Sequence, residues 1–202
     1  MTQERESFNK AITYIKREGI LELVNWLETD TDFFTAPAST QFHGNYEGGL
    51  LEHSMIVTRL ALHNFNFLVK QKPELEEYRE SVILCALFHD VCKTNYYFLE
   101  KKWTKDESNK WKEYFGYTTK DAFPLGHGEK SLYLISKQVR LTDAEAMAIR
   151  WHMGATEPSV GIPNNAHYYA YNEAINHWLV RLTHCADMLA MMIEEKRDLK
   201  NA

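Results

Sequence analysis

The stretch VILCALFHDVCK (residues 82–93) decides how the rest of the sequence is interpreted. Its first seven residues are apolar on every side of a helix, which is typical of a helix at the centre of a bundle. The adjacent His89 and Asp90 then end the apolar run, and Lys93 follows three residues after Asp90. Burying a carboxylate among apolar neighbours costs free energy unless a cation compensates it. We therefore expect a cation beside Asp90, inside a helical bundle.

The spacing of apolar residues around this stretch predicts further helices. One helical region covers residues 5–28 with a break near Gly19, and a turn-rich loop follows it as far as His43. A helix that opens at Gly48-Gly49 is stopped by Pro73, since proline cannot continue a helix. The remaining predicted helices cover residues 75–93, 128–139, 143–152 and 172–197, with a loop over 153–169.

Residues 95–124 differ from the predicted helices in their pattern of aromatic and polar residues. Aromatic residues flank the polar stretch KDESNK (105–110), a pattern that predicts a β-hairpin over about 95–118 with its turn near 106–109. The fold class is therefore all-α with one small inserted hairpin. Its aromatic rings either pack onto the helices or stack on an exposed base. Its lysines suit a phosphate-bearing ligand or a solvated edge (Lys101, Lys102, Lys105, Lys110 and Lys112).

Composition limits the function. The chain has 202 residues, 45% of them hydrophobic, with a net charge of −5 and a pI near 6.0. This is enough for one sizeable core, but an acidic chain is a poor candidate for broad duplex binding. The three cysteines lack the CxxC spacing of a zinc ribbon. We see no signal peptide and no apolar run of membrane-spanning length, and we expect a cytoplasmic protein that does not enter membranes.

Six residues with metal-binding side chains follow one another along the chain: His53, His89, Asp90, His127, His152 and Asp187. Imidazole and carboxylate groups from separate helices are common metal ligands in bundles. Two of the histidines and both aspartates would hold one divalent ion. His127 and His152 would hold a second ion, with Asp90 bridging, or would contact phosphate. This ligand mix does not choose among Mn, Co, Fe, Ni, Mg and Zn.

Several residues near these positions have two interpretations each. His43 is a general acid for a leaving oxygen or forms a structural hydrogen bond in its loop. Lys130 and Arg150 flank the two extra histidines and either bind phosphate or are solvated charges. Glu129 orients a water or a ligand, or favours the first turn of its helix. We expect no function for the remaining histidines considered (His63, His167 and His177).

The ordered pattern H…HD…D, formed by His53, His89-Asp90 and Asp187, resembles the HD superfamily of metal-dependent phosphohydrolases. The segment FHGNYEGGLLEHS (42–54) is similar to the entry of the HD domain in bacterial 3′→5′ exoribonucleases. The segments LTHCADMLA (182–190), FPLGHGEKS (123–131) and IRWHMG (149–154) are similar to those that supply the last aspartate and the extra histidines. The resemblance covers roughly residues 35–192.

The resemblance implies an HD-domain helical bundle spanning residues 1–202 as a single domain. Residues 1–34 would be an N-terminal helical extension, and residues 35–192 the HD core with its hairpin insertion at 95–124. It also implies hydrolysis of a phosphoester or phosphoanhydride bond of a nucleotide-type substrate by a metal-bound hydroxide. His53, His89, Asp90 and Asp187 would be the metal ligands, and Lys93 would contact a substrate phosphate as a point charge.

Two alternatives remain at this stage. The first is a nuclease or phosphodiesterase that acts on short single-stranded RNA or DNA and depends on the hairpin. The second is a catalytically inert HD module that binds a nucleotide. The exoribonucleases carry an N-terminal nucleic-acid-binding domain where this chain has helices, so we expect a smaller phosphorylated substrate. The aromatic hairpin also suits contact between copies of the chain in a homo-oligomer.

Overall fold

The computed structural model describes residues 2–156, 162–163 and 165–194. Helices dominate it, and its two strands form one antiparallel hairpin, which confirms the fold class predicted from the sequence. The α-helices and strands are α1 (Gln3–Ile12), α2 (Ile20–Thr29), α3 (Gly49–Gln71), α4 (Arg79–Phe88), β1 (Tyr97–Lys105), β2 (Trp111–Thr119), α5 (His127–Ser136), α6 (Asp143–Arg150), α7 (Ala166–Ala174) and α8 (Trp178–Glu194). Short 3₁₀ helices cover Pro73–Tyr78, Val91–Lys93 and Gly154–Thr156.

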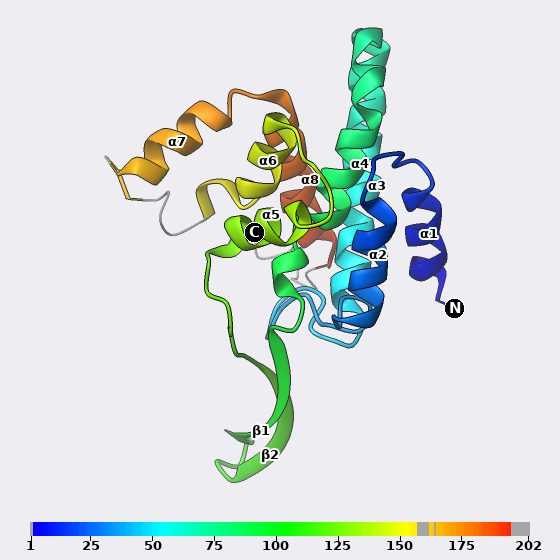
Figure 1. Cartoon of the computed structure of the whole chain (residues 1–202). Coiled ribbons are helices and arrows are strands. Elements are labelled where there is room, and N and C mark those ends of the chain that lie inside the picture. The colour runs from blue at the N-terminus through cyan, green and yellow to red at the C-terminus, as the bar shows by residue number, and fades with distance from the viewer. Residues whose placement is uncertain (1, 157–161, 164, 195–202) are drawn as a thin grey trace.

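Helices α3, α4 and α8 form the centre of the fold. Helix α3 packs against both α4 and α8, and α4 also contacts α8 (Figure 1). All seven residues from Val82 to Phe88 on α4 are buried, as the apolar character of this stretch predicts. A helix without a polar face is stable only where other elements surround it. This central position carries the end of α4, with His89 and Asp90, into the interior.

The helices on either side of this centre complete the bundle. Helix α1 packs on α3, while α5 packs on α6 and α6 packs on α8. The connection between α1 and α2 reaches α6 through Arg17, whose Nη1 lies 2.5 Å from Oε2 of the fully buried Glu145. Glu145 also completes a capping box with Thr142 at the start of α6. Helix α6 is therefore fixed at its first turn by both local and long-range hydrogen bonds.

One glycine sets the distance between α5 and α6. A Cβ atom added to Gly128 would lie only 2.0 Å from the carbonyl oxygen of Arg150. The two helices thus approach more closely than any other residue would permit at this position. His127 opens α5 and His152 follows α6, so this close approach brings the two histidines together.

The hairpin extends away from the helices as a two-stranded ribbon (Figure 1). Its register runs from the Tyr97–Thr119 pair to the Lys105–Trp111 pair. In the turn, Oδ1 of Asp106 accepts hydrogen bonds from the backbone N–H groups of Ser108 and Lys110. The predicted hairpin and the position of its turn are confirmed.

Two predicted helices differ in the structure. The helix expected over residues 75–93 has an α-helical part that ends at Phe88, because Asp90 leaves the helical conformation (φ −106°, ψ 19°). The segment expected as one helix over 172–197 contains only the end of α7 and the whole of α8. Helix α7 begins at Ala166, inside the stretch 153–169 that is expected to be a loop, and residues 157–161 and 164 of that stretch lie outside the described residues. The backbone N–H of Leu179 donates to Nδ1 of His177 at 3.3 Å, a cap that starts α8 separately. Residues 195–197 lie outside the described residues.

Candidate metal centre

The structure brings the six predicted metal ligands together from five different parts of the fold. His53 lies in the second turn of α3, His89 and Asp90 follow α4, and Asp187 lies in α8. Five of the six are buried, and His127 at the mouth of the group is partly exposed.

No described helix combines the length and apolar character needed to cross a bilayer.

Asp90 lies at the centre of the group. Its Oδ1 is 2.7 Å from Nε2 of His127 and 3.4 Å from Nε2 of His152. Its Oδ2 is 3.4 Å from Nε2 of His89, 3.5 Å from Nε2 of His53 and 2.7 Å from Nζ of Lys93. The two carboxylate oxygens thus face different sets of histidines.

Asp187 closes the group from the side of α8. Its Oδ1 lies 3.2 Å from Nε2 of His53 and 3.7 Å from Nε2 of His89. The Nε2 atoms of these two histidines are themselves only 3.3 Å apart. Nitrogen and carboxylate oxygen atoms therefore converge on one point, at separations that a shared cation would explain.

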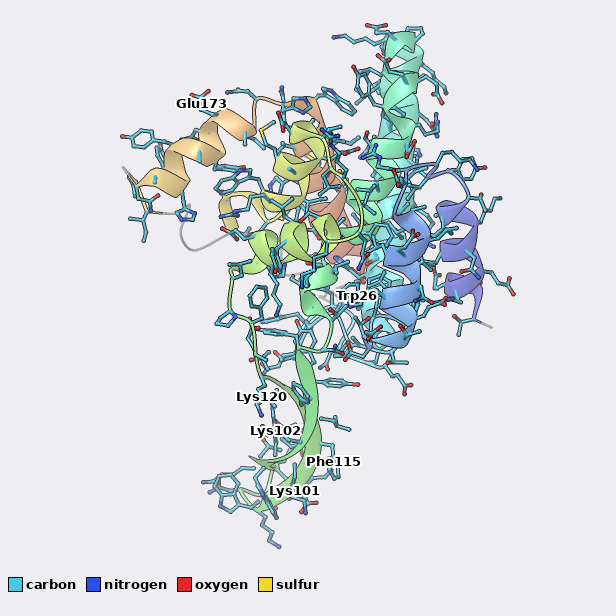
Figure 2. The ribbon with its side chains drawn as sticks, viewed as in Figure 1. Trp26, Lys101, Lys102, Phe115, Lys120 and Glu173 are labelled. Carbon is cyan, nitrogen blue, oxygen red and sulfur yellow. The ribbon has the colours of Figure 1, made fainter. Side chains whose placement is uncertain are left out.

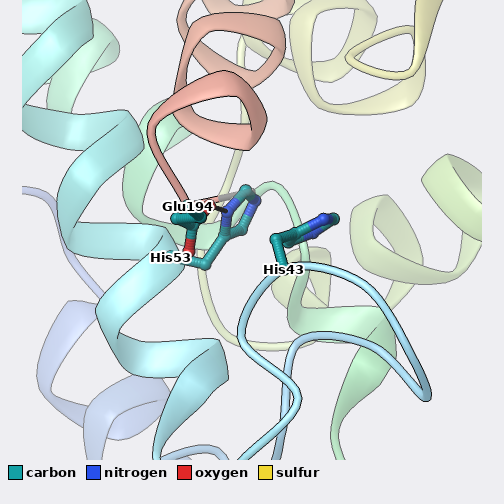
Figure 3. A group of neighbouring side chains, drawn as sticks. All are labelled: His43, His53 and Glu194. Carbon is teal, nitrogen blue, oxygen red and sulfur yellow. Dashed lines mark hydrogen bonds and ion pairs between the residues drawn. The ribbon is translucent and has the colours of Figure 1, made fainter. Parts of the chain in front are cut away.

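The histidines are oriented by the nitrogen that faces away from the centre. Nδ1 of His89 donates to the carbonyl oxygen of Ala86 at 2.9 Å, and Nδ1 of His152 donates to that of Ile149 at 2.7 Å. Nδ1 of His53 donates to Oε2 of Glu194 at 2.7 Å (Figure 3). With an ion bound at Nε2, each of these bonds would keep the remaining ring proton on Nδ1 and direct the Nε2 lone pair at the ion.

The residues fit a divalent ion by a further criterion. Nε2 of His152 is fully buried and has no hydrogen-bond partner among the described residues. An unsatisfied buried nitrogen is rare, because leaving it without a partner costs free energy. Two of the sets of side chains close enough to share an ion are His53–His89–Asp90 and Asp90–His127–His152. The buried histidine and aspartate clusters can therefore bind a divalent metal.

The charged side chains of the group stabilise one another's ionised forms. Burial opposes ionisation of Asp90, but Lys93 and the surrounding histidines hold the pKa of Asp90 well below its usual value. Burial also opposes protonation of His53, yet hydrogen bonds with Asp187 and Glu194 raise the pKa of His53 to about 9. The pKa of Asp187 is likewise lowered despite its burial, chiefly by its hydrogen bond with His53. The centre thus keeps both carboxylates ionised.

A cleft of about 510 Å³ opens beside this group, and Lys93 and His127 belong to its wall. The lining of the cleft includes the aromatic side chains of Phe42, Tyr96 and Tyr97. The cleft also reaches Thr119 at the foot of the hairpin. The Nζ atom of Lys93 faces Asp90, and its charge is therefore held between the carboxylate and the cleft.

His43 lies beside the group in the loop before α3. Its ring centroid is 4.9 Å from that of His53 (Figure 3). The side chain of Ser39 donates to the carbonyl oxygen of His43 at 2.8 Å, which fixes the loop. Burial lowers the pKa of His43, with His53 contributing in the same direction. Both interpretations of His43 thus have support: its backbone helps to fix the loop, and its ring lies beside the candidate metal ligands.

The remaining sequence candidates have protein partners. Nζ of Lys130 lies 2.7 Å from Oδ1 of Asp121, and both side chains line the cleft. Arg150 forms an ion pair with Glu129, and its guanidinium lies 3.9 Å from the ring centroid of Trp151. Arg150 and Glu129 are therefore brought near the centre mainly as a pair that connects α5 with the end of α6.

Sequence reasoning missed three residues of this region. Glu194 lies seven residues after Asp187 on α8, a spacing of two turns that places both on one helix face. Cys92 Sγ lies 3.4 Å from Nδ1 of His127, and the hydroxyl of Tyr97 donates to the carbonyl oxygen of Ala38 at 3.1 Å. Only the spacing of Glu194 from Asp187 could have been noticed in the sequence.

Comparison with known proteins gives one curated relative. The chain is 36% identical over 80 residues to a dihydroneopterin 2′,3′-cyclic phosphate phosphodiesterase of Methanocaldococcus jannaschii, a match that covers 40% of this chain and 32% of the relative. The chain thus spans about a third of the length of this relative. No family model and no solved structure matches the chain.

Proposed function

We propose that the chain is a metal-dependent phosphohydrolase of the HD superfamily that cleaves a phosphoester or phosphoanhydride bond of a small nucleotide-type substrate. The observation that carries this proposal is the convergence of the Nε2 atoms of His53, His89 and His152 on Asp90 and Asp187. Each of these rings donates its Nδ1–H to a separate acceptor. A purely structural histidine cluster has no need of such a common orientation.

The donor set divides between two ions. His53, His89, Asp90 and Asp187 would hold the first ion, and His127 and His152 would hold the second with the other oxygen of Asp90. When bound, divalent ions act as Lewis acids on a phosphoryl oxygen and lower the pKa of water. The buried side chains of the group exclude bulk solvent from the reacting atoms, which strengthens every electrostatic interaction there.

Residues of the cleft wall would act on the substrate. Burial disfavours the charge of Lys93, but Asp90 raises the pKa of this lysine above its usual value. Lys93 therefore remains cationic and would bind a phosphate oxygen. His43 lies outside this wall, with its ring centroid 4.9 Å from that of His53, and would donate a proton to the leaving oxygen. Because burial lowers the pKa of His43, the protonated ring that this step needs is favoured by acidic rather than neutral pH. The aromatic wall of the cleft would contact a planar base.

The curated relative supports the reaction class. Its name describes a phosphodiesterase acting on the cyclic phosphate of a pterin, a substrate that joins a phosphodiester to a planar heteroaromatic ring. A cleft that has an aromatic wall and contains Lys93 fits a substrate of this general chemistry. We extend only the bond type and the presence of a planar ring to this chain.

The test is a panel of phosphoesters assayed with the protein purified without chelator. The panel contains nucleoside mono-, di- and triphosphates, 2′,3′-cyclic nucleotides and bis(p-nitrophenyl) phosphate, each with Mn²⁺, Co²⁺, Ni²⁺, Fe²⁺, Mg²⁺ or Zn²⁺. We expect turnover of at least one ester that is lost with chelator and in Asp90→Asn. Asp143→Asn, which changes an exposed aspartate in the first turn of α6, is expected to keep it. Metal-loaded wild-type protein that cleaves no ester would support the inert nucleotide-binding alternative instead.

A further inference from the structure

The hairpin presents a continuous aromatic face to solvent. Side chains alternate between the two faces of a strand, so the face that begins at Tyr97–Thr119 also holds four further pairs. These are Leu99–Tyr117, Lys101–Phe115, Trp103–Glu113 and Lys105–Trp111. Its large apolar side chains are more than half exposed: Leu99 60%, Trp103 57%, Trp111 66% and Phe115 64%. An apolar patch of this kind usually marks an interaction site.

The position of this aromatic face leaves it open to a partner. Figure 2 shows Lys101 and Phe115, which pair across the two strands, on the part of the ribbon that lies away from the helices. A two-stranded ribbon has little stability of its own. Exposed tryptophan and phenylalanine side chains on such a ribbon therefore suggest that a bound partner covers them.

The ribbon is basic in an acidic protein. Residues 97–120 hold six lysines and four acidic residues, whereas the whole chain has a net charge of −5. Two of the acidic side chains are already engaged within the ribbon. Asp106 accepts hydrogen bonds from its own turn, and Oε1 of Glu113 lies 3.0 Å from Nζ of Lys101. Lys105 and Lys101, the latter paired with Glu113, lie on the aromatic face itself, and the ribbon as a whole keeps a net positive charge.

We infer that the aromatic face binds single-stranded nucleic acid. Aromatic side chains stack on bases of any sequence, and nearby cations contact the phosphates. A second copy of the chain fits this surface less well, because lysine is depleted from protein–protein interfaces. Lysines along exposed strands also oppose edge-to-edge pairing with another sheet.

The face leads directly to the metal centre. Tyr97 and Thr119, the pair at its foot, line the same cleft as Lys93 and His127. A strand that lies along the ribbon would therefore deliver its end to Lys93 and the histidine cluster. This last step rests on the proposed phosphohydrolase function, and it identifies the end of a short oligonucleotide as a substrate of that site. Binding to the ribbon itself does not depend on catalysis.

Binding can be measured without turnover. The full chain is titrated against fluorescein-labelled phosphorothioate oligothymidylate and oligouridylate twelve nucleotides long, and fluorescence anisotropy gives the affinity. The test variant is Trp103→Ser/Trp111→Ser. The matched control is Leu21→Ser/Phe67→Ser, which removes two equally exposed apolar side chains (70% and 63%) from α2 and α3. Because the four side chains are exposed, we expect both variants to fold.

We expect the wild type and the control to bind with equal affinity and the test variant to bind at least tenfold more weakly. Affinity should also fall as salt is raised, since phosphate contacts release counterions. Equal binding by all three proteins, or no binding by the wild type, overturns the inference.

Light scattering in the same samples adds a further outcome. A wild-type dimer that becomes monomeric only in the test variant would make a second copy the occupant and also overturn it. Hydrolysis of mononucleotides, if present, should be unchanged in the test variant, which separates failure of this inference from failure of the proposed function.

Discussion

Oε2 of Glu194 accepts a hydrogen bond from Nδ1 of His53 at 2.7 Å, while Nε2 of the same ring lies 3.2 Å from Oδ1 of Asp187. The imidazole of His53 thus joins a buried outer carboxylate to the inner group. An outer carboxylate of this kind fixes the tautomer of a metal-binding histidine and increases its basicity. Glu194 is therefore a positioning residue in the account proposed above.

Replacing Glu194 should weaken metal binding without removing a ligand. We expect Glu194→Ala to lower the affinity for a divalent ion about tenfold to a hundredfold, the usual effect of losing such a partner. Glu194→Gln should lose less, because its amide oxygen still accepts the Nδ1–H bond. Competition with a chromophoric chelator measures both. Unchanged affinity in Glu194→Ala would remove Glu194 from the site.

Lys93 should matter most to stability when no ion is bound. In Lys93→Met, Asp90 loses the ammonium group 2.7 Å from its Oδ2, and breaking a buried ion pair costs about 3–5 kcal/mol. A bound ion compensates the same carboxylate, so the loss should shrink when metal is added. Urea unfolding with chelator and with metal measures the difference. Lys130→Met is the control, since its partner Asp121 lies outside the cluster and its effect should be equal in both conditions. A Lys93→Met loss that is also equal in both would contradict a cation beside Asp90.

Gly128 should be intolerant of any side chain. A Cβ atom there would lie 2.0 Å from the carbonyl oxygen of Arg150, so Gly128→Ala must move α5 away from α6. We expect a loss of about 1–3 kcal/mol, the usual cost of overpacking, and a weaker second ion because His127 and His152 separate. Thermal unfolding and metal titration measure the two effects. Lys137→Ala, at the exposed end of the same helix, should change neither. A Gly128→Ala protein with wild-type stability would show that the two helices can part freely.

The stability of the protein should fall in acid partly through Glu145. Burial favours the neutral acid, but the hydrogen bond from Arg17 holds the pKa of Glu145 below its usual value, which is about 4.3 in an unfolded chain. The stabilisation is therefore complete above about pH 4.3 and is lost as the pH falls through the lower, folded value. Glu145→Gln should cost about 1–2 kcal/mol at pH 7, because Arg17 is partly exposed and solvent screens its charge, and the gap to the wild type should narrow towards pH 3. Urea unfolding between pH 3 and 7 measures this gap, and a constant gap would exclude the ionised Glu145–Arg17 pair as its source.

The sequence predicts the elements of this protein where local patterns are strong. The all-apolar residues 82–88 predicted a central helix, and the polar stretch between aromatic runs predicted the hairpin turn at Asp106. The six candidate ligands could be selected from the sequence because each lies on or next to a helix with a strong apolar pattern. The likeness to bacterial exoribonucleases and the boundaries of the domain stay predictions.

Features that depend on contacts between distant segments could not be predicted in this way. The carboxylate of Asp90, just after the end of α4, lies 2.7 Å from Nε2 of His127, and no local propensity describes that contact. Glu194 contacts His53 only because α8 packs on α3. The ion pair between Arg150 and Glu129 similarly requires α5 and the end of α6 to meet.

Bound metal per chain tests the central claim most directly. Elemental analysis is applied to wild type, Asp90→Asn, His127→Ala and Asp143→Asn, all purified without chelator. We predict close to two divalent ions in the wild type and in Asp143→Asn, about one in His127→Ala, and almost none in Asp90→Asn. Wild-type protein without metal after incubation with each divalent ion, or Asp90→Asn that retains as much metal as the wild type, would contradict the account.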